Sequence, residues 1–467
     1  IKPHTVTPAP TALFTKVMEQ QQKDREKRES ERTRVVDLRL GPQEKDNRYR
    51  NFVFDEKFAD GQIDFEPEQK KVALDSAEIR TETGAFRVHD YEVKFSPDII
   101  YGTVEYSQFF GVQGTTQLAL SDVLGNQRIN IYTNLFYDFR NSDYMVTYFY
   151  LPHRWDLGVG GYHNAYFFLS YNWGVIRDRN YGLSAYLSLP LSRYRRVDFS
   201  AGFLGIDRDY LDFTEEDQKS LEEIGYLPDT RRRFLLLGAS WVDDTSLWGI
   251  TGPVNGRRSA VGLMGSPGLF GAHGAEFLTA RLDWRRYYKV GKEYNFVVRV
   301  AGGASFGKQP QQFFVGGVEN WINREFSGGY VRVNNIEDIY FASFEMPFRG
   351  GSYYELAGNR FLLTNIEFRF PLIRYFLMGW PLPIGFQDIR GALFADLAGA
   401  QYRGEPFRAF VRAPNGFYKL QDLRMAFGLG MRANIGFLVL QFDIGWPTDL
   451  YATAHSPRYY WWLGAEF

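Results

Sequence analysis

Residues 128–140, RINIYTNLFYDFR, alternate between two kinds of side chain. The odd positions carry mostly apolar side chains, whereas the even positions carry arginine, asparagine and aspartate among two aromatics. A period of two places the two sets on opposite faces of a β-strand. One such strand suits a soluble sheet with a buried apolar face. It equally suits a membrane barrel whose apolar face meets lipid.

The same alternation returns in residues 362–370, 423–432 and 438–446. In each stretch one face is apolar and the other carries charged side chains or glycine, including Glu367 and Asp443. Charges repeated on the inner face of a sandwich core would be very costly. A water-filled barrel lumen accommodates them, so the repeated pattern favours a transmembrane β-barrel.

The composition agrees with this interpretation. The 467-residue chain has 17% aromatic residues and 46 glycines, a mean hydropathy of -0.33, and no run of about 18 apolar residues, which excludes a helical membrane protein. A net charge of -1 argues against nucleic acid as a partner. With no cysteine and six scattered histidines, we expect no metal site, no cofactor and no catalytic residues, hence no enzyme.

Sixteen alternating segments can be marked, an even number as in bacterial barrels. They are about 101–109, 115–122, 127–139, 142–151, 155–170, 180–190, 195–211, 231–242, 258–266, 276–288, 293–306, 360–371, 385–401, 421–434, 436–447 and 458–467. Long connections follow mostly the odd-numbered segments, and 243–257 and 372–384 are the exceptions. We therefore predict an all-β fold, a sixteen-stranded antiparallel transmembrane β-barrel over residues 96–467, embedded in outer-membrane lipid.

Residues 1–95 differ from the rest and are predicted to form an N-terminal periplasmic extension. Residues 23–34 hold six basic and four acidic side chains, which is typical of a solvated helix or linker. A helix that docks a partner is the alternative for this charged segment. The sequence leaves open whether residues 1–95 form a periplasmic arm or a plug in the lumen.

The chain ends on an alternating strand with Tyr459, Trp461, Leu463 and the terminal Phe467 on one face. A closing strand with a terminal aromatic resembles the recognition signal that outer-membrane barrels present to their assembly machinery. These four residues are therefore the predicted C-terminal barrel signal.

Four motifs in the last third of the chain resemble one family. They are Phe313–Phe314–Val315–Gly316–Gly317 followed by Arg324 and Phe326, then Thr364 to Pro371, Phe394–Ala395–Asp396, and Leu440 to Pro447. The chain is similar to the BamA-like insertase/translocase superfamily of outer-membrane barrels, also called bacterial surface antigen barrels. The family signature Val-Arg-Gly-Phe or Val-Arg-Gly-Tyr follows a glycine pair, but here Glu325 stands where the family has glycine.

The resemblance implies that the long extracellular loop 307–359 folds inward, with Gly316 and Gly317 as its glycine pair. A cation such as Arg324 needs a partner in a partly dehydrated lumen. Glu367 and Asp396 are expected on luminal faces of the next two strands. We predict that Arg324, with Phe326 beside it, pairs with one or both carboxylates, and the alternative is that Arg324 is solvated at the rim.

The resemblance also implies a role in protein transport or assembly. Client strands would pair with backbone edges at a weak lateral seam between segments 101–109 and 458–467, near Gly102 and Gly464. The alternatives are an anchoring barrel in a larger envelope complex and a plugged pore. Periplasmic or outer-membrane protein partners are expected in the Gram-negative envelope. Residues 97–126 resemble barrels that follow a TolB-like propeller, which is therefore a further candidate partner.

Overall fold

The computed structural model describes residues 91–107, 111–136, 138–170, 174–214, 220, 231–326, 340–378, 384–436 and 438–464. The chain divides into two units, Ile1–Asp90 and Tyr91–Phe467, and all described residues belong to the second. The predicted extension, apart from residues 91–95, and the terminal Phe467 lie outside the described residues. Among the residues described, no helix has the length and apolar character needed to cross a membrane.

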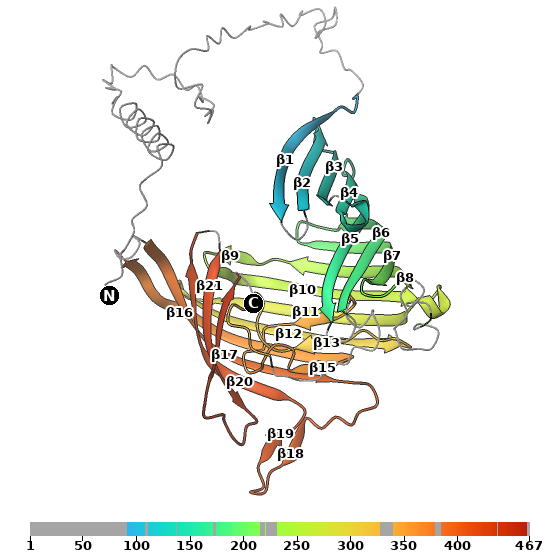
Figure 1. The fold of residues 1–467 in the computed structure, drawn as a ribbon. Coiled ribbons are helices and arrows are strands. Elements are labelled where there is room, and N and C mark those ends of the chain that lie inside the picture. Colours follow the sequence, from blue (N-terminus) through green and yellow to red (C-terminus); the bar gives the residue numbers. More distant parts are fainter. Residues whose placement is uncertain are drawn as a thin grey trace, which may run out of the picture. The chain divides into compact units, whose positions relative to one another are not determined.

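Long antiparallel strands make up most of the described chain (Figure 1). They are β1 (Phe95–Ser107), β2 (Gly111–Asp122), β3 (Gln127–Phe136), β4 (Asp143–Tyr150), β5 (Asp156–Ser170), β6 (Gly174–Pro190), β7 (Arg195–Tyr210), β8 (Arg231–Asp244), β10 (Gly252–Pro267), β11 (Glu276–Val290), β12 (Tyr294–Gly307), β16 (Arg360–Met378), β17 (Ile384–Gln401), β20 (Arg424–Asn434), β21 (Val439–Thr448) and β22 (Arg458–Leu463).

Each of these strands pairs antiparallel with the next one along the chain, from β1 with β2 to β21 with β22. The short strand β9 (Leu247–Gly249) pairs with the start of β10. The all-β antiparallel architecture is thus confirmed. Within the described residues no ladder joins β1 to β22, so closure into a barrel of sixteen strands remains a prediction.

Several predicted boundaries were wrong. The predicted strand 127–139 ends at Phe136, whose N–H donates a hydrogen bond to the Ser142 hydroxyl (2.9 Å). A short 3₁₀ helix, η2 (Phe139–Asn141), follows. A second one, η3 (Gly271–His273), precedes β11. The expected long connections 243–257 and 372–384 are mostly strand, because β10 begins at Gly252 and β16 continues to Met378.

The two faces of the sheet differ as the alternation predicts. On β16 and β17 the side chains of Glu367 and Asp396 are buried, whereas their neighbours Phe368 and Leu393 are exposed. On β20 the exposed face includes Leu429, with half of its surface accessible. The apolar face is therefore the outer one, as expected for a strand in lipid.

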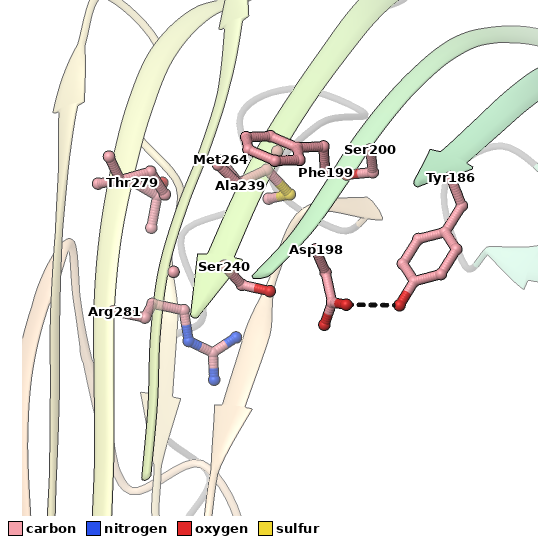
Figure 2. Close-up of a pocket in the computed structure, with 12 residues that line it drawn as sticks. Tyr186, Asp198, Phe199, Ser200, Ala239, Ser240, Met264, Thr279 and Arg281 are labelled. Atoms are coloured by element: carbon pink, nitrogen blue, oxygen red, sulfur yellow. Dashed lines mark hydrogen bonds between the residues drawn. The ribbon is translucent and has the colours of Figure 1, made fainter. Parts of the chain in front are cut away.

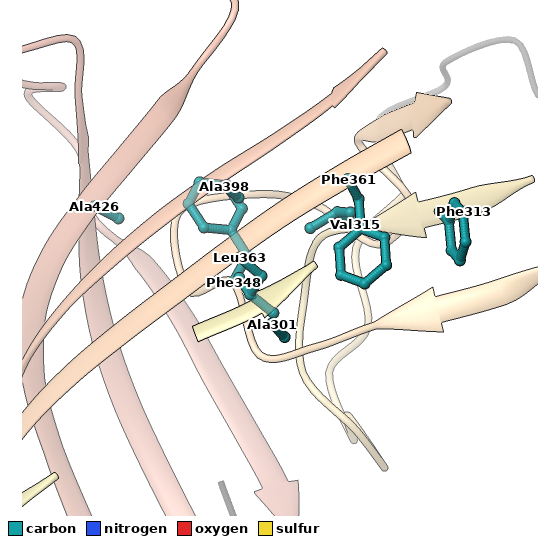
Figure 3. Packing of buried hydrophobic residues seen from close by; sticks show 8 residues of the cluster. All are labelled: Ala301, Phe313, Val315, Phe348, Phe361, Leu363, Ala398 and Ala426. Carbon is teal, nitrogen blue, oxygen red and sulfur yellow. The ribbon is translucent and has the colours of Figure 1, made fainter. Parts of the chain in front are cut away.

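The long loop between β12 and β16 covers the inner face instead of leaving it to water. It contains β13 (Phe313–Val315), which pairs parallel with β14 (Ser343–Glu345) and antiparallel with β15 (Leu356–Gly358). Phe313, Val315 and Phe348 of this loop pack on side chains from β12, β16, β17 and β20 (Figure 3). The predicted inward folding of the loop thus agrees with this packing. A separate hairpin joins β18 (Phe410–Arg412) to β19 (Tyr418–Leu420) (Figure 1).

The predicted glycine pair ends β13 and turns the loop. Gly316 and Gly317 have φ values of 141° and 78°, in the region that favours glycine. A Cβ atom on Gly316 would collide with the backbone oxygen of Ser352. Gly316 therefore allows two arms of the loop to approach each other closely.

The exposed face of β20 provides a test of its contact with lipid. Leu429→Arg should lower the free energy of unfolding in lipid vesicles by about 2–4 kcal/mol, because it places a charge on the lipid face of a strand. Leu269→Arg is the matched control, since Leu269 is exposed outside the strands and should change stability by about 0.5 kcal/mol or less. Equal effects of the two substitutions in urea titrations would contradict a lipid-facing β20.

Candidate functional site: a buried charge cluster under the long loop

Four neighbouring strands bring their inner faces together beneath the long loop. Strand register places Asn365 of β16 opposite Asp396 of β17, and the same inner face continues through β20 to Asp443 of β21. Because side chains alternate along a strand, Glu367 and Asp396 point to this same face. Strand register and alternation together thus gather three carboxylates on one wall.

Arg349 of the long loop fills the space between these carboxylates. Its Nε and Nη2 donate to the two carboxylate oxygens of Asp396 (2.8 and 2.7 Å), which is a bidentate pair. Its backbone N–H also donates to Asp396 (3.0 Å), and Nη1 donates to Glu367. The guanidinium lies 3.7 Å from the ring centre of Phe394. The side chains of Arg349, Glu367 and Asp396 have no accessible surface.

Two further arginines complete the cluster from the strands themselves. Arg432 Nη2 donates to Glu367 (2.8 Å), and Arg432 Nη1 donates to Asp443 (3.4 Å). Arg369 Nε donates to the other oxygen of Glu367 (2.7 Å). Among the described residues the cluster therefore contains three arginines and three carboxylates, so its formal charges cancel. Charge balance of this kind is what allows ions to be buried at all.

The protonation state of Arg349 follows from its surroundings. Burial alone would lower the pKa of its guanidinium, but Asp396 and Glu367 outweigh this effect and raise the pKa above its ordinary value. Arg349 therefore stays charged, and removing it would leave Asp396 without its counter-ion, whereas Glu367 would keep Arg369 and Arg432. Breaking a buried pair in this way typically costs about 3–5 kcal/mol.

The loop backbone approaches the sheet at a glycine of β21. A Cβ atom on Gly445 would collide with the backbone oxygen of Arg349 and lie 3.6 Å from the ring of Tyr460. Trp462 Nε1 donates to Asp443 (2.7 Å), and the Tyr460 hydroxyl donates to the backbone oxygen of Gly351 (3.0 Å). The last strand thus contacts both the charge cluster and the loop that carries Arg349.

The sequence named the correct carboxylates but the wrong arginine. Arg324 is exposed, and its guanidinium lies over the ring of Tyr353 at 4.3 Å. Phe326 is exposed as well and contacts Tyr353 (ring centres 5.6 Å apart). Instead of crossing the inner wall to Glu367 or Asp396, residues 320–323 contact the last strand, and Phe326 bridges to Tyr353 of the same loop.

A signal for the correct arginine was present in the sequence. Phe348–Arg349–Gly350 keeps the adjacent Arg–Gly of the family signature, whereas Arg324 is followed by Glu325. The missing side chain at Gly350 matters, because a Cβ atom there would collide with the Ala426 methyl group of β20. Arg324 lies closer in sequence to the Gly316–Gly317 pair, but the loop passes through β14 before it returns to the wall at Arg349.

The predicted C-terminal signal residues lie on the outer face of β22 where they are described. Tyr459 and Trp461 are 48% and 39% exposed, and both contact Phe442 of β21, with ring centres 6.4 and 4.2 Å apart. Leu463 ends the strand. Their role as an assembly signal remains a prediction.

A hollow of about 300 Å³ lies against β6, β7, β8, β10 and β11 (Figure 2). Its acid, Asp198, already accepts hydrogen bonds from Tyr186 (2.8 Å), Ser188 (2.6 Å) and Arg196 (2.9 Å). No histidine is among the described residues that line this hollow. The described residues contain no group of three or more side chains arranged to hold a metal ion.

Comparison with known proteins identifies the family. The chain belongs to the Omp85 superfamily, because the family model described as Omp85 superfamily domain matches residues 125–467. This confirms the resemblance to BamA-like insertases and translocases, and it makes the chain an insertase- or translocase-like barrel of the outer membrane. No curated protein matched the chain.

Three solved structures are similar to this chain. BamA from Haemophilus ducreyi lacking POTRA domains 1–3 has 13% identity and a TM-score of 0.48, with 84% of this chain and 76% of that chain covered. CdiB from Escherichia coli has 11% identity, a TM-score of 0.38 and coverage of 81% and 63%. CdiB from Acinetobacter baumannii has 12% identity, a TM-score of 0.36 and coverage of 79% and 64%.

The two arginines of the long loop give a direct test of the cluster. Arg349→Ala should lower the free energy of unfolding by about 3–5 kcal/mol, because it leaves the buried carboxylate of Asp396 without its counter-ion. Arg324→Ala is the matched control and should cost less than about 1 kcal/mol, since it removes only an exposed cation–π contact. Urea titrations in vesicles, followed by tryptophan fluorescence, measure both. Similar losses in the two variants would refute the cluster.

The close approach at Gly445 gives a second test. Gly445→Ala should cost about 1–3 kcal/mol, because the added methyl group must displace the loop backbone. The displaced loop should also become more sensitive to added protease. Gly114→Ala on β2 is the control, because a Cβ atom at Gly114 meets no atom within 4 Å. If Gly445→Ala is as stable and protease-resistant as Gly114→Ala, the loop does not rest on β21.

Proposed function

We propose that this barrel inserts or translocates protein chains through a lateral seam between β1 and β22, with its N-terminus on the periplasmic side. Membership of the Omp85 superfamily is the observation that carries this proposal. The short last strand supports it. The described β22 has six residues and β1 has thirteen, so a ladder between them would be limited by β22.

The filled inner wall supports a lateral route over a central one. Arg349 holds the loop against β16, β17 and β21, and Phe313 and Phe348 pack beneath it. A wide aqueous channel would require this buried cluster to be broken, at a cost of several kcal/mol. Opening the edge between two strands breaks only backbone hydrogen bonds, which an entering strand replaces.

The mechanism needs no cofactor and no enzymatic step. A client chain would approach in extended form, thinned lipid would ease its entry, and its backbone would pair with the exposed edge of β1 or β22. Gly102 in β1 and Gly464 after β22 weaken the strands on the two sides of the seam. Residues 1–95 would then act as a periplasmic arm for protein partners, and a TolB-like propeller is one candidate partner.

The test uses the full chain in lipid vesicles. A urea-unfolded eight-stranded outer-membrane barrel is added, and its folded fraction is followed by its altered gel mobility without heating. Vesicles with this protein should fold the client several times faster than vesicles with an unrelated outer-membrane barrel at the same density. Equal rates in the two vesicle preparations would refute the proposal.

The alternatives give different results in parallel measurements. Steady ion conductance in planar bilayers without accelerated client folding would indicate a pore. Recovery of a stoichiometric set of envelope proteins from gently solubilised membrane, again without accelerated folding, would indicate an anchoring subunit.

A further inference from the structure

The edge of β22 that points away from β21 can be identified from the pairing of these two strands. Gly464 N–H donates to the backbone oxygen of Val439 on β21 (3.0 Å). In an antiparallel strand, the backbone groups of alternate residues point to opposite sides. The backbone N–H and C=O groups of the even-numbered residues of β22 therefore point toward β21. The backbone groups of Tyr459, Trp461 and Leu463 face the other side, where a next strand would pair.

A segment of the long loop occupies this edge. Ile322 N–H donates to the backbone oxygen of Trp461 (2.7 Å). The side chain of Asn323 accepts from Trp461 N–H (2.9 Å) and donates to the backbone oxygen of Tyr459 (2.9 Å). One asparagine side chain thus satisfies a donor and an acceptor, as a neighbouring strand would do.

The same segment is fixed at its other end and from below. Asn320 Nδ2 donates to the backbone oxygen of Leu463 (3.1 Å). Trp321 forms an antiparallel bridge with Trp462, is only 3% exposed, and lies 4.8 Å from the ring centre of Tyr460. Its indole N–H donates to Asn323 Oδ1 (2.7 Å), which orients the amide toward the edge. These contacts fix the position of residues 320–323 against β22.

We propose that residues 320–323 are an edge cap, which must leave β22 before another strand can pair there. The inference rests on the proposed seam function, because it names the element that controls access to the seam. Neighbouring strands lie about 4.7–4.9 Å apart, so one edge holds one partner at a time. An extended client strand, or β1 itself, would need the same groups of Tyr459, Trp461 and Leu463 that the cap now uses.

The cap binds the edge through only a few hydrogen bonds, which an incoming strand could replace. Its contacts to the edge come from one backbone N–H and two asparagine side chains, and Ile322 is 61% exposed. An incoming strand would replace each of these hydrogen bonds with a backbone hydrogen bond of the same kind. Trp321 would keep the released segment close to β22, since it is held by the inward-facing Tyr460 and Trp462.

The contact itself can be tested in the natural chain, because the chain has no cysteine. Ile322→Cys with Trp461→Cys places two thiols beside the Trp321–Trp462 bridge, and mild oxidation in membranes should cross-link them. Val411→Cys with Lys419→Cys, opposite each other in the β18–β19 hairpin, is the matched control. Cross-linking of the control pair without cross-linking of the cap pair would overturn the proposal.

The asparagine contributes a second, independent measurement. Asn323→Ala should accelerate amide hydrogen exchange at Trp461 by about tenfold, because the Trp461 N–H loses its acceptor. Asn415→Ala is the control, since the Asn415 side chain accepts from a backbone N–H in an exposed turn and should leave Trp461 unchanged. Unchanged exchange at Trp461 in Asn323→Ala would also overturn the proposal.

The consequence is measured with the client-folding assay. Oxidation of the cap pair should slow client folding at least tenfold relative to the same variant when reduced, and oxidation of the hairpin pair should have no effect. Full activity of the oxidised cap pair would overturn the cap as a control on the seam. If the unsubstituted protein shows no activity, the proposed function fails, whereas cross-linking and exchange still decide whether the cap exists.

Discussion

The rest of this structure depends on the fully buried ion pairs of Arg349 with Asp396 and Glu367. A lone ion at this position would be too costly to bury, so loop and wall stabilise each other's charges. The arginine comes from the long loop, and the carboxylates come from β16 and β17. The path of the loop therefore has to satisfy the pairing of these charges together with the apolar packing of Phe313 and Phe348.

The same constraint explains where the inner wall is made of small residues. Gly445 of β21 and Ala426 of β20 lie directly under the loop segment that carries Arg349, and larger side chains there would collide with it. Opposite charges and small side chains are thus used together, the first for attraction and the second for close approach. Neither feature alone would fix the loop, because a bidentate pair requires both distance and orientation.

The alternation of side chains was enough to predict which face of β16, β17 and β20 is exposed and which is buried. It also placed Glu367 on the inner face, since a period of two depends only on local geometry, and the resemblance of Phe394–Ala395–Asp396 to the family motif placed Asp396 there. The arginine could not be found in this way, because a loop has no period that relates Arg324 or Arg349 to the wall. The edge contacts of Asn320 and Asn323 were equally invisible, since they depend on how a long loop returns through space.

The two roles of the loop are physically connected through β22. The Tyr460 hydroxyl donates to Gly351 O and Arg458 pairs with Glu355 (3.4 Å), so the segment next to Arg349 holds the inner face of this strand. Asn323 holds its edge. Any partner that removes the edge contact acts on a strand that also contacts the charge cluster. Because a packed cluster of paired ions has discrete arrangements, occupation of the edge and the position of the loop are expected to be coupled in both directions.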